Sequence, residues 1–361
     1  MESLSLYIDA FRPYVLPGLF AFVATFVLSF LALRVFPKIG LMDRPHLYGL
    51  KRKPVPYSGG LILALVFFVS VFLFMKIDVR LTAVLGAAGL IVLVSFLDDR
   101  FRLSPLLRLF VQIVAALLVV LAGVGVTSIT NPFGGMISLD AFQFSLHWGG
   151  AVHTYATLAV IFTVFWIVLL MNTVNWLDGL PGLVSGISVL ASVLLFVLSI
   201  RPHFHYIDQT DVAMFAIILA GACLAFWRFD FSPAKMLMGD TGSMFLGFML
   251  AILSIFSGGK IATAFLIMGF PILDAFWVVM RRIAKGQSPL KGDLGHFHHR
   301  LLKAGFSERK VIVFIYALCA LFGGLALVLG SQGKLIALVV MGVMMGVLGS
   351  WVARKGKKEG N

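Results

Sequence analysis

Apolar runs long enough to cross a membrane recur from one end of this chain to the other. The hydrocarbon core of a bilayer is roughly 30 Å thick, which an α-helix of about 20 residues can span. Helices satisfy their own backbone hydrogen bonds in lipid, whereas open strands do not. The sequence therefore predicts an all-α, polytopic membrane protein with about eleven transmembrane helices, at about 15–36, 59–76, 81–97, 106–126, 154–171, 182–200, 211–227, 241–257, 261–280, 311–330 and 335–352.

The composition agrees with this prediction and argues against an ordinary water-soluble fold. Hydrophobic residues make up 60% of the 361 positions and charged residues 12%, against about half and about a quarter in soluble domains. No linker or repeat interrupts the pattern, so we expect a single membrane-embedded domain over residues 1–361. Cys223 and Cys319 lie in separate apolar runs and are expected to pack in the interior.

The basic residues are distributed unequally between the two sides that these spans create. Most of the 29 Lys and Arg residues fall on one side, while the other side has Arg12, Lys76, Arg80, Arg201, Lys260 and Lys334. Loops rich in Lys and Arg stay in the cytoplasm, so we expect the N-terminus outside and the C-terminus inside. The net charge of +13 then reflects contact with an anionic leaflet rather than with nucleic acid. The predicted cytoplasmic segments are about 37–58, 98–105, 172–181, 228–240, 281–310 and the basic tail 353–361, and the external loop at about 127–153 suits a short hairpin.

Polar and ionisable residues gather at the predicted cytoplasmic ends of the spans, where their cost in lipid makes them candidates for function. The basic segment around Lys53 runs into a Gly-Gly pair, which suits either phosphate binding or a stop-transfer charge cluster. The pair Asp98-Asp99 ends the third span and suits Mg²⁺, an attacking group or a mutual pKa shift. The alternative for this pair is a solvated helix end neutralised by Arg100 and Arg102.

Two further clusters have the same location. Asn172 and Asn175 share a helix face that Asp178 extends, so the row offers amides and a carboxylate to a base, a ribose or a metal. Asp240 follows Gly239 just ahead of a helix, among small residues that let a phosphate approach the backbone. An N-cap is the alternative reading of Asp240.

The last predicted cytoplasmic loop contains three histidines, His296, His298 and His299, followed by Arg300. Their spacing resembles a set of metal ligands, but no cysteine or nearby glutamate completes a zinc site. Binding of a diphosphate fits these residues better, and a solvated loop is the alternative.

Two positions stay open from the residues alone. Asp274 lies within a predicted span, where it either faces a catalytic cavity or pairs with a buried partner such as Arg281. Arg108 and Gln112, one helical turn apart, either support a lipid phosphate or extend toward the membrane surface.

Taken together and in this order, these segments resemble the polyprenyl-phosphate N-acetylhexosamine-1-phosphate transferases. The resemblance covers roughly residues 40 to 303 and rests on five segments: Lys53–Gly60, Asp98-Asp99, Asn172–Leu183, Gly239–Ser243 and His296–Leu301. The histidine segment is similar to that of the N-acetylglucosamine branch rather than the phospho-N-acetylmuramoyl-pentapeptide branch. This chain departs from the pattern at Pro181, where the family has a second Asp, and at Asp230 and Leu237, which leaves the nucleotide contacts open.

The resemblance implies transfer of N-acetylglucosamine-1-phosphate, or of a closely related hexosamine phosphate, from a UDP-sugar to undecaprenyl phosphate. It implies Mg²⁺, or Mn²⁺ in its place, with Asp240 as the metal ligand. The implied catalytic residues are Asp98, Asp99, Asp240, His296, His298 and His299, and the implied substrate-binding residues are Lys53, Asn172, Asn175, Asp178, Gly239 and Arg300. It also implies a homodimer in the bacterial inner membrane, with the site on the cytoplasmic face.

Two rival functions are weighed against this one. A phospho-N-acetylmuramoyl-pentapeptide transferase keeps the fold and changes the donor. A secondary transporter favours charges at the membrane midplane and internal repeats, whereas this chain shows polar residues at one face and no repeat.

Overall fold

Long apolar helices dominate the computed structural model, which describes residues 2–45, 52–201, 208–257, 261–288 and 295–358. Among these residues, seven helices are long and apolar enough to cross a membrane, or eight if one bent pair counts as a single span. The helices are α1 (Glu2–Lys38), α2 (Gly60–Phe74), α3 (Val79–Phe101), α4 (Pro105–Leu121), α5 (Thr157–Leu177), α6 (Leu183–Ser199), α7 (Thr210–Asp230), α8 (Gly239–Phe256), α9 (Ile261–Ile267), α10 (Gly269–Ala284), α11 (Phe297–Lys303), α12 (Glu308–Val328) and α13 (Ser331–Lys358). The protein is thus a multi-pass membrane protein built from helices.

Each of the predicted apolar segments coincides with one of these helices or with the bent pair. Three of them, α2, α4 and α6, are shorter apolar helices of 10–17 residues. The predicted single span at 261–280 is wrong in one respect, because α9 and α10 are bent by 80° at the break between them. Gly269 and Pro271 lie directly after this break, and Pro lacks the N–H that would continue the hydrogen bonding of a helix.

The predicted loops also need correction. Residues 98–101 and 172–177 belong to helices, the histidine loop contains the short helix α11, and the basic tail is helical to Lys358. The hairpin predicted for the loop at about 127–153 is confirmed, and the all-α fold class is corrected, because this segment forms two antiparallel ribbons, β1 (Ser128–Thr130) with β2 (Met136–Ser138) and β3 (Gln143–Trp148) with β4 (Ala151–Ala156). Lys51, Lys260 and Lys291 lie outside the described residues.

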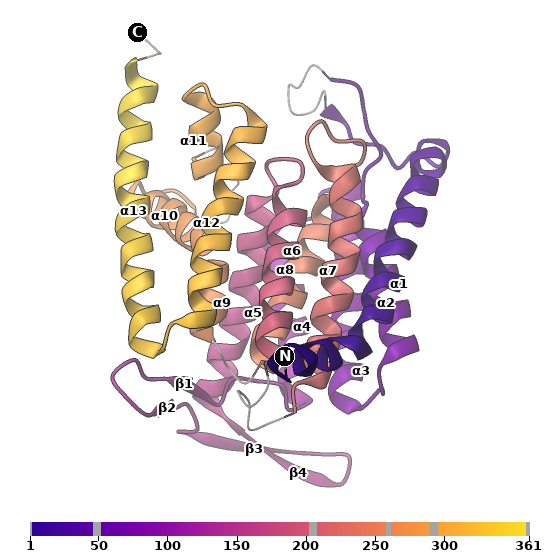
Figure 1. Cartoon of the computed structure of the whole chain (residues 1–361), viewed down its shortest axis with the longest axis vertical. Coiled ribbons are helices and arrows are strands. Elements are labelled where there is room, and N and C mark those ends of the chain that lie inside the picture. Colours follow the sequence, from indigo (N-terminus) through magenta and orange to yellow (C-terminus); the bar gives the residue numbers. More distant parts are fainter. Residues whose placement is uncertain (1, 46–51, 202–207, 258–260, 289–294, 359–361) are drawn as a thin grey trace.

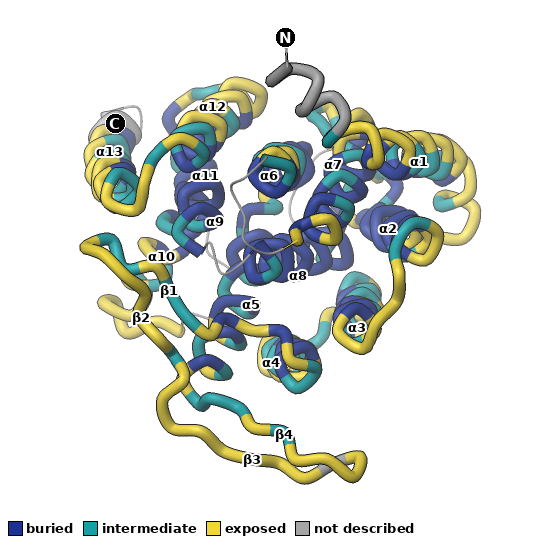
Figure 2. The backbone as a smooth tube through the Cα atoms, turned by 60° about the horizontal axis from the view of Figure 1, so that its bottom comes forward, coloured by how far each residue is buried: buried dark blue, intermediate teal, exposed yellow. Residues whose placement is uncertain are grey.

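Helix α8 occupies the centre of the bundle, where it packs against α5, α3 and α2 (Figure 2). It is buried along almost its whole length. A Cβ on Gly60 would collide with the backbone of Gly242, so the first turns of α2 and α8 approach closely because both positions are glycine. Cys223 and Cys319 are buried free thiols, as predicted.

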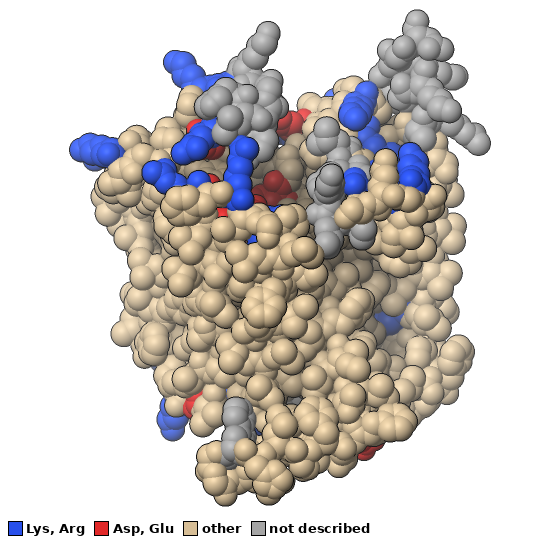
Figure 3. Space-filling view, turned by 180° about the vertical axis from the view of Figure 1, so that it is seen from behind, with Lys and Arg blue, Asp and Glu red and all other residues tan. Residues whose placement is uncertain are grey.

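The two ends of the bundle differ in character. The ribbons lie at one end, and the C-terminus and α11 lie at the other (Figure 1). Lys and Arg side chains crowd the end that carries the C-terminus (Figure 3). The predicted gathering of basic loops on one side is therefore a property of the folded molecule.

Candidate active site

The chain turns sharply after α3, so that Asp98 contacts the turn and the beginning of α4. Arg102 adopts a left-handed conformation with φ 55°, and the Ser104 hydroxyl accepts a hydrogen bond from the Leu107 N–H as α4 begins. The buried Asp98 carboxylate accepts hydrogen bonds from the Leu103 N–H at 2.6 Å and from the Arg108 guanidinium at 2.9 Å. Arg108 is therefore a partner of a buried carboxylate and does not simply extend toward the membrane surface.

Asp99 fastens the end of α3 to the beginning of α8. One carboxylate oxygen accepts from the Asp240 N–H at 2.8 Å. The other accepts from the Thr241 hydroxyl at 2.6 Å and from the Ser58 hydroxyl at 2.9 Å. Asp98 and Asp99 are thus held by specific partners, and the reading of a solvated helix end neutralised by Arg100 and Arg102 is wrong.

Gly239 is required by the way Asp99 approaches α8. Its φ of +73° lies in the left-handed region, and a Cβ there would come within 2.6 Å of an Asp99 carboxylate oxygen. Both the backbone conformation and the contact favour glycine at this position. Its role in the structure is to let Asp99 reach the backbone N–H groups of α8.

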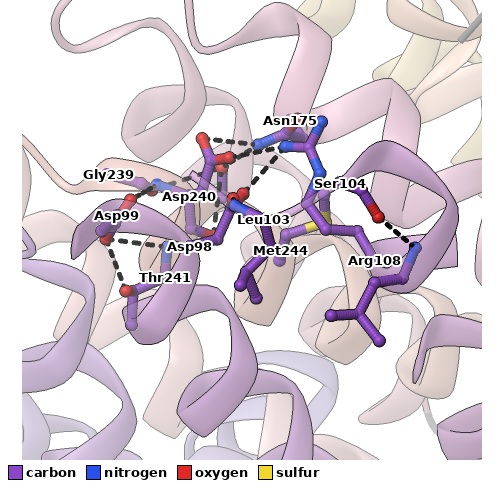
Figure 4. A network of polar contacts seen from close by, with 12 residues as sticks. Asp98, Asp99, Leu103, Ser104, Arg108, Asn175, Gly239, Asp240, Thr241 and Met244 are labelled. Carbon is purple, nitrogen blue, oxygen red and sulfur yellow. Dashed lines mark hydrogen bonds and ion pairs between the residues drawn. The ribbon is translucent and has the colours of Figure 1, made fainter. Parts of the chain in front are cut away.

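Asp240 faces Arg108 and Asn175 and does not cap α8. The N-cap residue is Met238, without a side-chain hydrogen bond, so the capping alternative is wrong. One Asp240 oxygen accepts from the Asn175 amide at 3.1 Å, and the other accepts from Arg108 at 3.0 Å (Figure 4). A single guanidinium nitrogen of Arg108 thereby bridges the carboxylates of Asp98 and Asp240.

These groups border a cavity of about 530 Å³ at the basic end of the bundle. The cavity is lined by both signs of charge: Asp43, Asp98, Asp99, Asp240, Arg44, Arg100, Arg102 and Arg108. Acidic side chains are visible inside the hollow, with basic side chains around it (Figure 3). Cations beside carboxylates suit a polyanionic ligand that arrives with a divalent metal ion.

Asp178 lies directly after α5 and close to the same carboxylates. Desolvation, together with the negative charges of Asp230, Asp240 and Asp99, raises its pKa well above the ordinary value. A cation or a hydrogen-bond donor from a ligand would relieve this destabilisation.

The turn that follows Asp178 is held by buried polar groups. The Asp230 carboxylate accepts from the Gly182 N–H at 3.1 Å and from the Ser185 hydroxyl at 2.7 Å. The Tyr316 hydroxyl donates to the Gly182 carbonyl. Asp230, one of the positions at which this chain differs from the family pattern, therefore holds the turn between α5 and α6.

The histidines pack against this turn. A Cβ on Gly179 would lie 2.5 Å from the His298 ring, and the His298 and His299 rings are 4.2 Å apart. His298 is buried, and neither of its ring nitrogens has a hydrogen-bond partner among the described residues. Desolvation, and then the neighbouring charges of His299 and His296, lower the pKa of His298 well below its usual value. A buried, neutral imidazole with two unused nitrogens is suited to bind a ligand.

Asp274 is the partner of the first histidine. Its carboxylate lies 3.0 Å from the His296 Nδ1 and accepts from the Phe297 N–H at 2.8 Å. Of the two alternatives for Asp274, the pair with a buried partner is confirmed, and the partner is His296 instead of Arg281. Asp274 orients His296 and the beginning of α11.

Three predicted substrate-binding residues lie apart from the carboxylates. Lys53 is exposed and does not line the cavity. The Asn172 amide donates to the Gln112 side chain at 2.7 Å, so Gln112 supports α5 and not a lipid phosphate directly. The Arg300 guanidinium donates to the Gly349 carbonyl of α13.

The donor chemistry at Asp240 fits a hard divalent cation. Among the described residues, no group of three or more His, Cys, Asp or Glu side chains is arranged to hold a metal ion. Mg²⁺, however, commonly takes one or two protein carboxylates and completes its sphere with water and substrate phosphates. The Asp240 side chain is 31% exposed and borders the cavity, which suits this mode.

Sequence reasoning missed the partners that hold the carboxylates. Ser58 and Thr241 bind Asp99, although both stand within segments that had been singled out for phosphate chemistry. The sequence alone does not decide between the two roles of Arg108. Its spacing of ten residues from Asp98, across a Ser-Pro helix start, was the available signal that both face one site.

The fold and the site define a multi-pass membrane protein with a charged cavity at one end of its helical bundle. A model of glycosyl transferase family 4 matches residues 81–258. A Bacillus subtilis protein named "Probable undecaprenyl-phosphate N-acetylglucosaminyl 1-phosphate transferase" is 30% identical over 86% of this chain and 84% of its own length. This chain belongs to glycosyl transferase family 4.

Other relatives carry related names. A Mycolicibacterium smegmatis protein named "Decaprenyl-phosphate N-acetylglucosaminephosphotransferase" is 29% identical over 92% of this chain and 86% of its own length. A Salmonella typhi protein named "Undecaprenyl-phosphate alpha-N-acetylglucosaminyl 1-phosphate transferase" is 30% identical over 84% of this chain and 80% of its own length.

Proposed function

We propose that this protein transfers N-acetylglucosamine-1-phosphate from UDP-N-acetylglucosamine to undecaprenyl phosphate and releases UMP. The observation that carries the proposal is the convergence of Asp98, Asp99, Asp240 and Arg108 on one cavity at the basic end of the membrane bundle. The names of relatives that match over most of the chain support the donor and the acceptor. A muramoyl-pentapeptide donor and a transport function have no comparable support.

In the proposed reaction, a phosphate oxygen of the lipid attacks the sugar-linked phosphorus of the donor. The bond from this phosphorus to the bridging oxygen breaks, the electron pair stays on that oxygen, and UMP leaves. Because two polyanions must meet, charge neutralisation and positioning supply most of the catalysis. The lipid phosphate is already largely ionised at neutral pH, since its second pKa is near 6, so Asp98 serves to position it or to accept its remaining proton.

The residues divide this work between them. Arg108, which lines the cavity, would turn from the carboxylates toward an entering phosphate. The N–H of the neutral His298 ring would donate to the diphosphate, and Gly179 leaves room for this ring beside the turn. Asn175 donates a hydrogen bond to Asp240, and Asp178 lies near the same carboxylate. These two residues are the candidates for binding the nucleotide or the sugar. Mg²⁺, when bound at Asp240, would neutralise charge on the diphosphate.

Lys53 and Arg300 differ in the role that we propose for them. Lys53 is exposed and does not line the cavity among the described residues. Its contact with the donor stays a prediction. The described contact of Arg300 with α13 favours a role in holding α11, which contains His298 and His299.

The membrane arrangement completes the proposal. We infer eleven spans, with α9 and α10 together forming one, an external N-terminus, and a cytoplasmic active site in the bacterial inner membrane. The unequal distribution of Lys and Arg between the two ends supports this orientation (Figure 3). The homodimer stays a prediction from the resemblance.

The transfer is tested with the purified full chain, undecaprenyl phosphate and Mg²⁺, by measuring UMP from three separate donors: UDP-N-acetylglucosamine, UDP-N-acetylgalactosamine and the UDP-muramoyl-pentapeptide. We expect lipid-dependent UMP from the first alone. Asp240→Asn is expected to abolish it, whereas the matched control Asp140→Asn, in an exposed loop between the ribbons, keeps full activity. UMP from the pentapeptide donor would overturn the branch, and no UMP from any donor with folded protein would overturn the reaction.

The orientation is tested separately by labelling single cysteines with a membrane-impermeant maleimide after Cys223 and Cys319 are replaced by Ala. A cysteine at the exposed Ser145 should react in intact cells, and one at the exposed Lys285 only after lysis. The reverse pattern would refute the orientation without touching the chemistry.

A further inference from the structure

A second cavity, of about 640 Å³, lies at the opposite end of the bundle from the carboxylates. Its walls come from the hairpin of β1 and β2, the end of α6, the beginning of α9 and the turn from α12 into α13. Figure 2, which brings this end forward, shows α9, α12, α13 and β1 on one side of the molecule. The proposed transfer makes no use of this cavity.

Two cations converge on the cavity, although basic residues are scarce at this end. The Arg201 guanidinium donates to the Leu327 carbonyl at 2.6 Å, and the Lys334 ammonium donates to the Thr263 hydroxyl at 2.7 Å. Both side chains are half-buried, and their charges interact with each other. None of the described residues that line the cavity is acidic. The two like charges therefore repel each other in a partly desolvated place, and an anion between them would be stabilised by both.

The beginning of α13 adds to the positive potential. Gly330 and Ser331 line the cavity as this 28-residue helix starts. The first N–H groups of a helix have no partner within the helix and carry a partial positive charge. They add to a site that the two side-chain cations already define.

The remaining walls are apolar and adjoin the lipid-facing surface. Leu327, Val328, Leu329, Leu335 and Leu338 line the cavity. Val328 is 72% exposed, and the neighbouring Ile336 is 63% exposed, on helices that are long and apolar enough to cross a membrane. A ligand with a phosphate at one end and an acyl chain at the other would match cations and apolar wall together.

We propose that this cavity binds the phosphate headgroup of an anionic membrane lipid from the leaflet at the ribbon end, between Arg201 and Lys334. The acyl chain would lie along α12 and α13. The headgroup would join α6, α9 and α13, so its binding should stabilise the bundle. This inference does not rest on the proposed transfer.

The test is native mass spectrometry of the full chain in detergent, with phosphatidylglycerol, phosphatidylcholine or inorganic phosphate added, and the thermal unfolding temperature measured beside it. We expect phosphatidylglycerol to bind and to raise the unfolding temperature. Lys334→Gln should weaken this binding about tenfold, because one charge-assisted hydrogen bond is lost. Lys334→Arg, which keeps the charge, should restore most of it.

The matched control is Lys76→Gln, which removes an exposed charge at the same end but outside the cavity, and it should leave lipid binding unchanged. Equal binding by wild type and Lys334→Gln, or equally tight binding of phosphatidylcholine, would overturn the proposal. Displacement of the lipid by inorganic phosphate at equal concentration would overturn the lipid in favour of a soluble anion. A cooperative thermal unfolding transition in the same samples shows that each variant is folded.

Discussion

Replacement of Gly239 by Ala probes the joint between α3 and α8 on which the site depends. The added Cβ would lie 2.6 Å from an Asp99 carboxylate oxygen, and the backbone would keep a φ of +73°. The left-handed conformation costs a non-glycine residue about 1–2 kcal/mol. If Asp99 moves away, it weakens its bonds to Asp240 and Thr241, and each hydrogen bond to a charged group contributes about 1.5–3 kcal/mol.

The matched control separates these two costs. Gly123 has a similar φ of +84° with no atom within 4 Å of an added Cβ. Gly123→Ala should therefore lose about 1–2 kcal/mol from backbone strain alone. Gly239→Ala should lose about 2.5–5 kcal/mol in total, because the strain adds to the loss of one hydrogen bond to the displaced carboxylate.

The assay combines thermal unfolding in detergent with the rate of UMP release. Gly239→Ala should unfold at a lower temperature than Gly123→Ala and should lose about 100-fold in kcat, since misplacement by about 1 Å has an effect of that size. Gly123→Ala should keep the wild-type kcat. Equal unfolding temperatures and equal rates in the two variants would refute the argument that Asp99 needs glycine at this position.

Three further changes test other contacts. Arg108→Gln should lower kcat about 100-fold or more by removing the cation between the two carboxylates, and Arg108→Lys should recover part of the rate. Because the pKa of His298 is lowered in the folded protein, the unfolded chain binds a proton at a higher pH than the folded chain, and stability should fall as the pH drops below 6.5. The unfolding temperature of His298→Asn should depend less on pH. Asp230→Ala should lower the free energy of unfolding by about 1–3 kcal/mol, because the buried Gly182 N–H loses its acceptor, whereas the Ser185 hydroxyl keeps the Gly182 carbonyl.

Each of these changes has an outcome that contradicts it. Equal kcat for the Lys and Gln variants at position 108 would show that the positive charge is unimportant. Identical pH profiles for wild type and His298→Asn would place the pH dependence elsewhere. A stability loss from Asp230→Ala no larger than that from Asp208→Ala, whose carboxylate is exposed, would mean that the turn does not depend on Asp230.

The apolar pattern alone determined the location of every long helix, because lipid permits few ways to pair the backbone. It failed where apolarity carries no directional information: the 80° bend between α9 and α10 divides a stretch that reads as one continuous span. The sequence predicts a short hairpin at about 127–153 but not the two ribbons that form there, since their strands are short and their pairing is decided by turns.

The site divides in the same way. The sequence marked Asp98, Asp99, Asn175 and Asp240 as candidates, because a polar group at the end of an apolar helix is costly unless it has a use. Only the tertiary structure decided the partners: Arg108 between two carboxylates, Asp274 behind His296, and Asn172 turned to Gln112. Contacts of this kind join residues separated by up to 142 positions in the chain, so they depend on how the helices pack and not on local spacing.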